Sequence, residues 1–333
     1  MLYNKNMNIA LRRPVHQGNK GDDLMVLAAL EQLHHHNVDV VTAIQHSRYD
    51  AIIDCCGYAY TDEWGPANAL RLSSELLEYS SPHTKVMLLP QTLGPFQCVK
   101  TQEAMKSIIE KAHCVYARDN VSLRHAQHLH PTYAHHVHYA PDITVLINGT
   151  QSLHLPGNIA IIPNVHMYRL PAGKSAYITL LQRVYSSLLV RGHTPFLMTH
   201  DHIDDAFIAE FSAMFMPNIP ILFEEDALAM KGVVSQCSAV ISSRFHGILN
   251  AVSQGVPTLG TAWNYKFNAL FAEYNCSECL LSPTASINTI EQALDAILTP
   301  SLSFCLRQKI TTAQQNNVQL SQRMWSHIHT LLL

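Results

Sequence analysis

Short apolar runs alternate with longer segments of helical periodicity along the first half of the chain. In residues 24–33, for example, Leu24, Leu27, Ala28 and Leu30 recur at the spacing of one helix face. Strands are expected at residues 7–11, 51–54, 86–90 and 114–119, and helices at 24–33, 69–79, 100–113 and from 122 onward. This alternation predicts a parallel sheet covered by helices on both faces.

The same pattern restarts after a turn-rich stretch at residues 148–158. Strands are expected at residues 158–164, 194–199, 219–222, 239–242 and 257–261, and helices at 176–191, 205–216 and about 303–332. Two Rossmann-like α/β domains follow, at residues 1–152 and 153–333, and the last helix is a candidate to pack back onto the first domain. Ligands of such sheets bind beyond the carboxyl ends of the strands, so the cleft between the domains is the expected active site.

The composition fits a globular enzyme and argues against some classes of partner. Hydrophobic residues make up 47% of the 333 residues, charged residues make up 14%, and the net charge is −3 with histidine neutral. The basic residues are scattered, which argues against a nucleic-acid-binding face. No apolar run reaches the length of a membrane span, and residues 1–6 lack a signal-peptide core. A cytoplasmic protein is expected, with peripheral membrane contact left open.

Cysteine and histidine are frequent, yet neither predicts a metal site. The eight cysteines include one CxxC pair, Cys276 and Cys279, with no second pair to complete a zinc site, so reduced thiols are expected. Two histidine tracts, at residues 34–36 and 135–138, are conspicuous among the 21 histidines. Neither tract has carboxylate or cysteine partners at ligand spacing, so no bound metal is expected.

The strand-to-helix segment at residues 240–252 carries the clearest candidate chemistry. Its apolar residues end on two serines, and Arg244 and His246 then begin a helical pattern. A helix N-terminus carries partial positive charge, arginine offers a planar fork for an oxyanion, and histidine exchanges a proton near neutral pH. An anionic substrate is therefore predicted here. Lys266 follows the next strand and would join this group if the two strands are neighbours.

Polar residues also follow three earlier strands. Residues 18–22 (Gly-Asn-Lys-Gly-Asp) include two glycines that let backbone approach a ligand, but they form neither a Walker A loop nor a GxGxxG motif, so no nucleotide cofactor is indicated. Asp22 fits either a helix N-cap or a functional carboxylate. Gln91 is expected to reach the cleft. Arg118 is expected at the mouth of the cleft, where contact with an anion is favoured over a simple pair with Asp119.

Taken together, these motifs resemble those of the polysaccharide pyruvyl transferase family. In chain order they are Gly18–Asp22, residues 90–96 (Pro-Gln-Thr-Leu-Gly-Pro-Phe), Ala117–Asp119 with Ser122, Pro141–Asp142, Arg244–His246 and residues 255–266. The ordered set spans roughly residues 9–270. The resemblance implies a GT-B-like fold. It also implies transfer of a pyruvyl group from phosphoenolpyruvate onto two hydroxyls of a sugar as a ketal, with release of phosphate, in exopolysaccharide or cell-surface glycan synthesis.

The resemblance also suggests roles for individual residues, without a cofactor or a metal. Phosphoenolpyruvate is expected on the side of the second domain, at Arg244, Phe245, His246 and Lys266, with Arg118 reaching it from the first domain at the mouth of the cleft. His246 is the candidate general acid or partner of the leaving phosphate, and Asp22 the candidate base for a sugar hydroxyl, although these two roles could be exchanged. The acceptor is expected on the first domain, at Asn19, Gly21, Asp22, Gln91 and Tyr58.

One departure from the family concerns the acceptor side. The family has a glycine cluster after its second strand, whereas Asp54 here is followed by Cys55, Cys56 and Gly57. Cysteine side chains would narrow a space that glycines leave open. The identity of the acceptor sugar is therefore left open. A lipid-linked oligosaccharide is what the family suggests, with the enzyme at the inner face of the cytoplasmic membrane.

Two other functions are compatible with the same pattern. The first is a GT-B glycosyltransferase that uses a nucleotide sugar, for which Glu224 or Glu225 would supply the ribose-binding carboxylate. The second is a non-catalytic, anion-binding subunit of a polysaccharide assembly complex. Retention of all four of Arg118, Arg244, His246 and Lys266 argues against the second alternative.

Overall fold

The computed structural model describes residues 6–151 and 155–333, and their contacts group them into two compact units. Unit 1 consists of residues 6–17, 24–147 and 317–333, and unit 2 of residues 18–23, 148–151 and 155–316. Segment 18–23, from the first half of the chain, thus belongs to unit 2. Segment 317–333, from the second half of the chain, belongs to unit 1. The predicted boundary between residues 152 and 153 lies outside the described residues.

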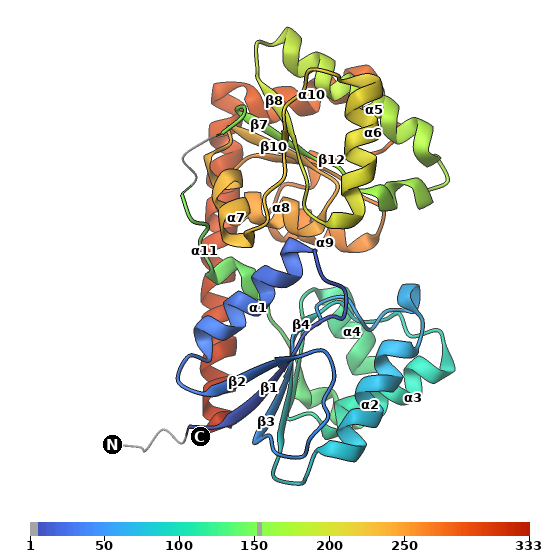
Figure 1. Cartoon of the computed structure of the whole chain (residues 1–333), viewed down its shortest axis with the longest axis vertical. Helices are drawn as coiled ribbons and strands as arrows, with labels where there is room; N and C mark the ends of the chain where they lie inside the picture. Colours follow the sequence, from blue (N-terminus) through green and yellow to red (C-terminus); the bar gives the residue numbers. More distant parts are fainter. Residues whose placement is uncertain (1–5, 152–154) are drawn as a thin grey trace. The chain divides into compact units, whose positions relative to one another are not determined.

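Unit 1 is built on a parallel sheet, which among its described residues has six strands in the order β2-β1-β3-β4-β5-β6 (Figure 1). The strands are β1 (Asn8–Arg12), β2 (Asn37–Val41), β3 (Ala51–Asp54), β4 (Lys85–Gln91), β5 (Cys114–Ala117) and β6 (Val137–Tyr139). The helices are α1 (Lys20–Gln32), which enters unit 1 at Leu24, α2 (Ala67–Tyr79), α3 (Val99–Lys111), α4 (Asn120–Leu129) and the second half of α11 (Pro300–Leu332).

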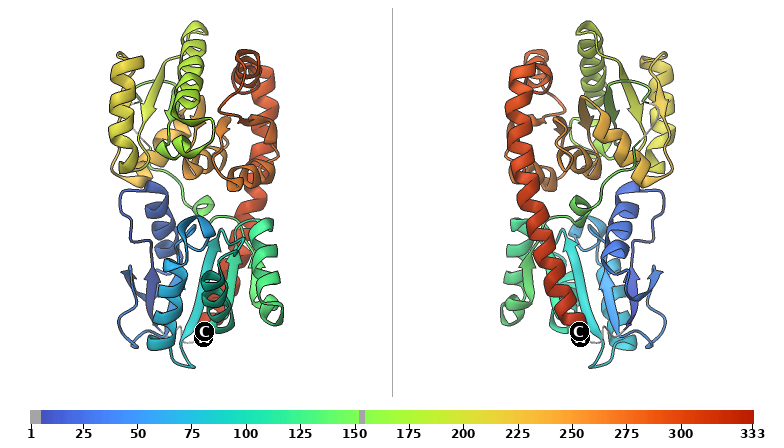
Figure 2. Two further views of the ribbon diagram at one scale, coloured as in Figure 1. Left: turned by 90° about the vertical axis from the view of Figure 1, so that its right-hand side faces the viewer. Right: turned by 90° about the vertical axis from the view of Figure 1, so that its left-hand side faces the viewer.

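The sheet of unit 1 is covered on both faces. Val86 and Leu88 of β4 pack into a core with Leu72 of α2 and Ile108 of α3. Side chains alternate along a strand, so Met87, which is completely buried, faces the opposite side. The second half of α11 runs alongside the strands of unit 1 (Figure 2). Burial on both faces is what a parallel sheet requires.

Unit 2 contains a second parallel sheet, whose six strands in the described part of the chain have the order β12-β11-β10-β7-β8-β9 (Figure 1). The strands are β7 (Ile159–Ile162), β8 (Pro195–Met198), β9 (Ile221–Leu222), β10 (Ala239–Ser242), β11 (Thr258–Thr261) and β12 (Leu280–Leu281). The helices are α5 (Gly173–Val190), α6 (Asp205–Phe215), α7 (Ala227–Gln236), α8 (Phe245–Val252), α9 (Tyr265–Glu273), α10 (Ile287–Leu298) and the first half of α11.

Each sheet contains one point where the strand order reverses. In unit 2, β7 lies between β8 and β10, and in unit 1, β1 lies between β2 and β3. The connections that leave the two sides of such a reversal run over opposite faces, which leaves a crevice at the carboxyl ends of the strands where ligands bind. The turn after β10, which carries Arg244 and His246, lies at the reversal in unit 2.

The predicted α/β architecture with parallel sheets is confirmed, and two predicted strands, 51–54 and 239–242, have the observed bounds. The sequence pattern did not identify β2, β6, β12, α7, α9 and α10. The strand β2 is a largely exposed edge strand and β12 has only two residues, so neither produces a continuous apolar run. No helix in the described ranges combines the length and the apolarity that crossing a bilayer requires.

Candidate functional site in unit 2

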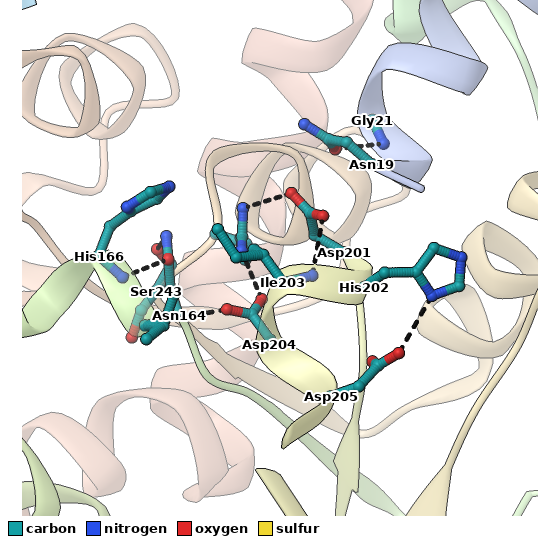
Figure 3. Close-up of polar contacts among 12 residues, drawn as sticks. Asn19, Gly21, Asn164, His166, Asp201, His202, Ile203, Asp204, Asp205 and Ser243 are labelled. Carbon is teal, nitrogen blue, oxygen red and sulfur yellow. Dashed lines mark hydrogen bonds and ion pairs between the residues drawn. The ribbon is translucent and has the colours of Figure 1, made fainter. Parts of the chain in front are cut away.

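The turn between β10 and α8 is fixed by hydrogen bonds to two neighbouring strands. Asn164, which follows β7, donates from Nδ2 to the carbonyl oxygen of Ser243 at 2.9 Å (Figure 3). The Ser243 hydroxyl lies 2.7 Å from the hydroxyl of Tyr177 and 2.6 Å from that of Thr261 at the end of β11. The strand-to-helix turn predicted from the sequence is confirmed, and α8 begins directly after Arg244.

The guanidinium of Arg244 is held by two carboxylates from the segment that follows β8. Its Nε donates to Oδ2 of Asp204 at 2.7 Å, its Nη2 lies 2.6 Å from the same oxygen, and its Nη1 donates to Oδ2 of Asp201 at 3.0 Å. Burial raises the pKa of the Asp204 carboxyl above its ordinary value, and the positive charge of Arg244 opposes this shift. The Arg244 guanidinium, which the sequence predicted to contact a substrate anion, is therefore held in one orientation by Asp201 and Asp204.

The imidazole of His246 lies against the backbone of Gly21. A Cβ atom at Gly21 would lie 2.1 Å from Nδ1 and 2.4 Å from Cγ of that ring, so only glycine fits. The segment around Gly21 is bound to the loop after β8, because Lys20 N–H donates to the carbonyl of His200 at 3.0 Å. The structure thus brings together the motifs around Gly21 and His246, and both lie in unit 2.

Asn19, not Asp22, occupies the capping position of α1. The Asn19 Oδ1 atom accepts a hydrogen bond from Gly21 N–H at 3.0 Å (Figure 3), and α1 begins at Lys20. Asp22 lies in the first turn of the helix. The interpretation of Asp22 as an N-cap is therefore wrong, while its carboxylate remains at the positive end of the helix dipole.

Lys266 lies among aromatic rings at the start of α9. The sequence predicted that it would join Arg244 and His246 if the two strands were neighbours. Because β10 and β11 are neighbours, the start of α9 lies next to the start of α8. The Lys266 Nζ is 4.8 Å from the ring centroid of Trp263 and 5.7 Å from those of Phe245 and Phe267. Such cation–π contacts hold an ammonium group in a partly dry environment.

His166, which follows β7, belongs to the same group. Its ring centroid lies 5.2 Å from that of Trp263. Burial, together with the positive charges of Arg244, Arg169 and Lys266, lowers the pKa of His166 to about 4. His166 is therefore neutral near pH 7, and the mutual repulsion of these cations is what an anionic ligand would relieve.

Arg118 and Gln91 belong to unit 1 and are engaged there. The Nε of Arg118 donates to the hydroxyl of Thr92 at 2.6 Å, and its Nη1 donates to Oδ2 of Asp142 at 3.2 Å. Asp119, the alternative partner, instead caps α4. Gln91 is completely buried, and its amide donates to Oδ1 of Asp54 at 2.8 Å. The expectation that Gln91 reaches an open cleft is therefore wrong, because its side chain supports Asp54.

The segment after β3 in unit 1 is tightly packed. Cys55 and Cys56 are buried, and burial raises the pKa of Cys56 well above its ordinary value. Tyr58 donates its hydroxyl hydrogen to Glu63 and packs edge-on against the ring of Trp64 at 6.1 Å. Gly57 has a φ of +60°, a conformation that favours glycine. The cysteines thus occupy core space here, as the departure from the family's glycine cluster suggested.

Sequence reasoning missed a second cluster, which lies at the strand reversal of unit 1. Arg12, the last residue of β1, is completely buried and donates to Oδ2 of Asp54 at 2.9 Å, to Glu75 Oε2 at 3.0 Å and to the hydroxyl of Tyr60 at 3.0 Å. The only sequence signal was an arginine at the end of an apolar strand. The cluster is inaccessible, so it ties β1, β3 and α2 together instead of binding a ligand.

In the described part of the chain, no group of three or more histidine, cysteine, aspartate or glutamate side chains is arranged to hold a metal ion. The cysteines, Cys276 and Cys279 included, are free thiols. Burial raises the pKa of Cys279 to about 12, so its thiol is not ionised near pH 7.

Comparison with known proteins gives one family and one type of fold. The model of the polysaccharide pyruvyl transferase family matches residues 19–265, a stretch that includes Gly21, Arg118, Arg244 and His246, whereas Gly18 and Lys266 lie one residue outside it. No curated protein sequence matches the chain.

Solved structures share the fold across nearly the whole chain. A protein described as a UDP-N-acetylglucosamine 2-epimerase from Listeria monocytogenes superposes with a TM-score of 0.65 at 11% identity, covering 97% of this chain and 96% of that one. Anabaena HepE in complex with UDP-glucose gives 0.60 at 13% identity, with 98% and 100% covered. WaaG, a glycosyltransferase involved in lipopolysaccharide biosynthesis, gives 0.52 at 13%, with 96% and 99% covered. The chain therefore has a GT-B type of fold, and at such low identity the likeness extends to the fold alone.

Proposed function

This chain belongs to the polysaccharide pyruvyl transferase family, and from that membership we propose that it transfers a pyruvyl group from phosphoenolpyruvate to a sugar. Two hydroxyls of the sugar bond to the same carbon, which becomes a ketal, and the carbon–oxygen bond to phosphate breaks. The methylene carbon of phosphoenolpyruvate gains one proton and phosphate leaves with another, so the two protons lost by the hydroxyls balance the reaction.

The observation that supports this proposal most directly is the meeting of two family motifs at the strand reversal of unit 2. His246 lies against Gly21, and Arg244 precedes His246 at the end of β10. A proton donor and a cation at a helix start provide what an enol phosphate needs, namely a proton for carbon and compensation for a carboxylate and a phosphate.

Roles in the reaction follow from the chemistry of these groups. His246 donates the proton that turns the enol carbon into a methyl group, or protonates the leaving phosphate. Asp22, in the first turn of α1, accepts a proton from an attacking hydroxyl. Lys266 compensates the negative charge of phosphate, and Arg244 with the first N–H groups of α8 orients the anion. His166 is neutral near pH 7 and so can donate one hydrogen bond and accept another.

The acceptor is proposed to be a precursor of an exopolysaccharide or another cell-surface glycan. If that precursor is lipid-linked, the reaction takes place at the inner face of the cytoplasmic membrane with the enzyme bound peripherally. The scheme requires neither a cofactor nor a metal, because proton transfer and charge compensation come from side chains.

A glycosyltransferase that uses a nucleotide sugar is the alternative that a test has to exclude. One of its two candidate ribose-binding residues, Glu225, is engaged in unit 2 with Lys20 Nζ at 2.7 Å and with His202 Nε2 at 3.4 Å. The UDP-glucose in the HepE structure is a ligand of that protein, which shares 13% of its residues with this chain. Fold likeness is therefore the main support for this alternative.

The test is phosphate release from phosphoenolpyruvate in the presence of a panel of sugars, lipid-linked ones included. Acceptor-dependent release is expected from the native protein, with a fall of about 100-fold or more in His246→Ala, the size of contribution typical of a general acid. His46→Ala, which changes an exposed histidine of unit 1, is the control and is expected to retain activity. No release with any acceptor, together with tight binding of a nucleotide sugar, would replace this proposal by the glycosyltransferase alternative.

A further inference from the structure

His200 is a buried histidine of unit 2 that the proposed reaction does not use. It follows β8, is 1% exposed, and neither of its ring nitrogens has a hydrogen-bond partner in the described part of the chain. Its own backbone comes near the ring, but not in hydrogen-bond geometry. Buried polar side chains nearly always have partners, because an unmet donor or acceptor raises the free energy of the folded state. Exceptions are expected at sites where a ligand supplies the missing partner.

Main-chain hydrogen bonds place His200 beside the start of α1. Its carbonyl oxygen accepts a hydrogen bond from Lys20 N–H at 3.0 Å. The next residue of that helix, Gly21, packs against the imidazole of His246. The two histidines are therefore brought to the same turn of α1, within the part of unit 2 where the anion is proposed to bind.

The side chain of His200 is also close to the two proposed anion-binding groups. The residue after it, Asp201, accepts a hydrogen bond from Nη1 of Arg244 at 3.0 Å (Figure 3 shows the Asp201 carboxylate). Burial, followed by the positive charges of His246 and Arg244, lowers the pKa of His200 to about 3, so its ring lies within electrostatic reach of both. The imidazole is therefore uncharged near pH 7 and has one N–H donor and one acceptor nitrogen.

We propose that His200 is a further substrate-binding residue, whose ring N–H donates a hydrogen bond to the anion that Arg244 and His246 bind. This inference rests on the proposed function, since it takes phosphoenolpyruvate as that anion. An oxygen of the carboxylate or the phosphate supplies the acceptor that the protein does not. Because the His200 ring is neutral, it adds a donor to the site without adding a charge that would repel protonated His246.

Calorimetry of phosphoenolpyruvate binding to His200→Leu and His200→Gln measures the contribution of this donor. Leucine fills a similar volume without a polar atom, whereas glutamine keeps an N–H group. Loss of a hydrogen bond to a charged group is expected to weaken binding about 10- to 100-fold in His200→Leu. His200→Gln is expected to bind phosphoenolpyruvate more tightly than His200→Leu does.

His193→Leu is the matched control at the opposite end of β8. The ring of His193 has a partner, since its Nδ1 lies 3.2 Å from Nδ2 of Asn158. This variant also replaces an imidazole by leucine, but at the amino end of the strand. It is expected to bind phosphoenolpyruvate as the native protein does.

Urea unfolding without ligand separates a binding role of His200 from a structural one. Leucine at this position removes two unmet polar atoms, so His200→Leu is expected to unfold at the same urea concentration as the native protein or at a higher one. A histidine that served only the packing of unit 2 would give the opposite pair of results, namely lower stability and unchanged affinity.

Nitrogen-15 NMR of the histidine rings tests the same contact in the native protein, so the test does not depend on the folding of a variant. The signal of His200 is assigned by its absence from His200→Gln or from His200→Leu. It is expected to show a neutral ring between pH 5.5 and pH 8, and its N–H signal is expected to shift when phosphoenolpyruvate is added.

The outcomes separate this inference from the proposed function. Unchanged affinity in His200→Leu, or an N–H signal that phosphoenolpyruvate does not shift, overturns the role of His200 and leaves the pyruvyl transferase proposal intact. Binding that depends on His200 but leads to no turnover with any acceptor supports the role of His200 and contradicts the transfer reaction. No binding of phosphoenolpyruvate to the native protein overturns both.

Discussion

The imidazole of His246 occupies the space into which any side chain at Gly21 would project. Gly21→Ala would place a methyl group 2.1 Å from Nδ1, and the backbone on both sides is tied into unit 2. We expect the variant to displace the ring, to lower phosphate release by about 100-fold and to destabilise unit 2 by about 1–3 kcal/mol. Acceptor-dependent kinetics and urea unfolding measure the two effects.

The double variant Gly21→Ala with His246→Gly provides the internal control for this clash. His246→Gly removes the imidazole and also the His246 Cβ, which lies 2.7 Å from the position of the new methyl group, so Gly21→Ala is expected to destabilise the His246→Gly protein much less than it destabilises the native protein. Equal destabilisation by Gly21→Ala in both backgrounds would mean that the two residues are not in contact.

The buried cluster in unit 1 gives a prediction about stability that does not depend on function. Arg12→Met leaves the buried carboxylate of Asp54 without its cation and leaves Glu75 with the more distant Arg71, and breaking a buried pair in this way costs about 3–5 kcal/mol. Arg48→Met removes the exposed pair with Asp39 and is expected to lower the free energy of unfolding much less, because water screens that pair. Equal free energies of unfolding for the two variants would contradict the assigned importance of the Arg12 cluster.

Comparison of sequence and structure shows which contacts a linear pattern can reveal. Arg244 and His246 were found because parallel strands place their carboxyl ends, and the helix starts that follow, at one edge of the sheet. Asp201 and Asp204 were missed because acidic residues before a helix are ordinarily read as caps. Their partner Arg244 lies 43 residues after Asp201 and 40 residues after Asp204, and only the fold brings it to them.

Gln91 illustrates the opposite error. Its position at the end of β4 was correct, but a strand end specifies only where a side chain begins, not what it contacts. The buried carboxylate of Asp54 on the neighbouring strand accepts a hydrogen bond from the Gln91 amide at 2.8 Å. A buried carboxylate without hydrogen-bond donors raises the free energy of the folded state enough to decide the conformation of Gln91. Such pairings depend on side-chain packing, on which a single sequence carries little information.

The two histidine tracts, for which the sequence offered no role, meet the last helix within unit 1. Tyr116 and His327 of α11 are hydrogen-bonded at 2.6 Å, and the ring of His138 lies 5.4 Å from that of His327. His329, two residues further along α11, is close enough to His36 to influence its ionisation. The segment 317–333 is thus anchored to unit 1 in part through imidazoles.

This arrangement makes the anchoring of segment 317–333 sensitive to acid. Burial, followed by nearby histidines, lowers the pKa values of His36, His138 and His329 below the ordinary 6.5. Groups with a lowered pKa stabilise the packed state fully above pH 6.5, and this contribution is lost as pH falls below 6.5. Hydrogen exchange in residues 317–333, corrected for intrinsic rates, is expected to be about tenfold faster at pH 5.5 than at pH 7.5.

The double variant His138→Gln with His329→Gln is expected to lose most of that pH dependence, since glutamine does not titrate. His83→Gln, at an exposed position of unit 1, serves as the matched control and is expected to behave as the native protein does. A pH dependence that is unchanged in the double variant would assign the effect to other groups.

Lys266 and His166 give a spectroscopic test of the cationic group in unit 2. The charge of Lys266 contributes, after burial and after Arg244 and Arg169, to the low pKa of His166, which is about 4. Lys266→Met keeps an apolar chain among the three aromatic rings and removes the charge, so the pKa of His166 is expected to rise, as followed by NMR titration. Lys174→Met, which removes a lysine 5.3 Å from the Tyr168 ring, is the matched control and is expected to leave His166 unchanged.

The same variant tests whether this group receives the substrate anion. Loss of a charge-assisted hydrogen bond costs about 1.5–3 kcal/mol, so phosphoenolpyruvate is expected to bind about 10- to 100-fold more weakly to Lys266→Met than to the native protein. A shift in His166 without a change in affinity would show that Lys266 shapes the electrostatics of the site but does not contact the anion. That outcome would leave Arg244 and the first turn of α8 as the proposed anion-binding groups of unit 2.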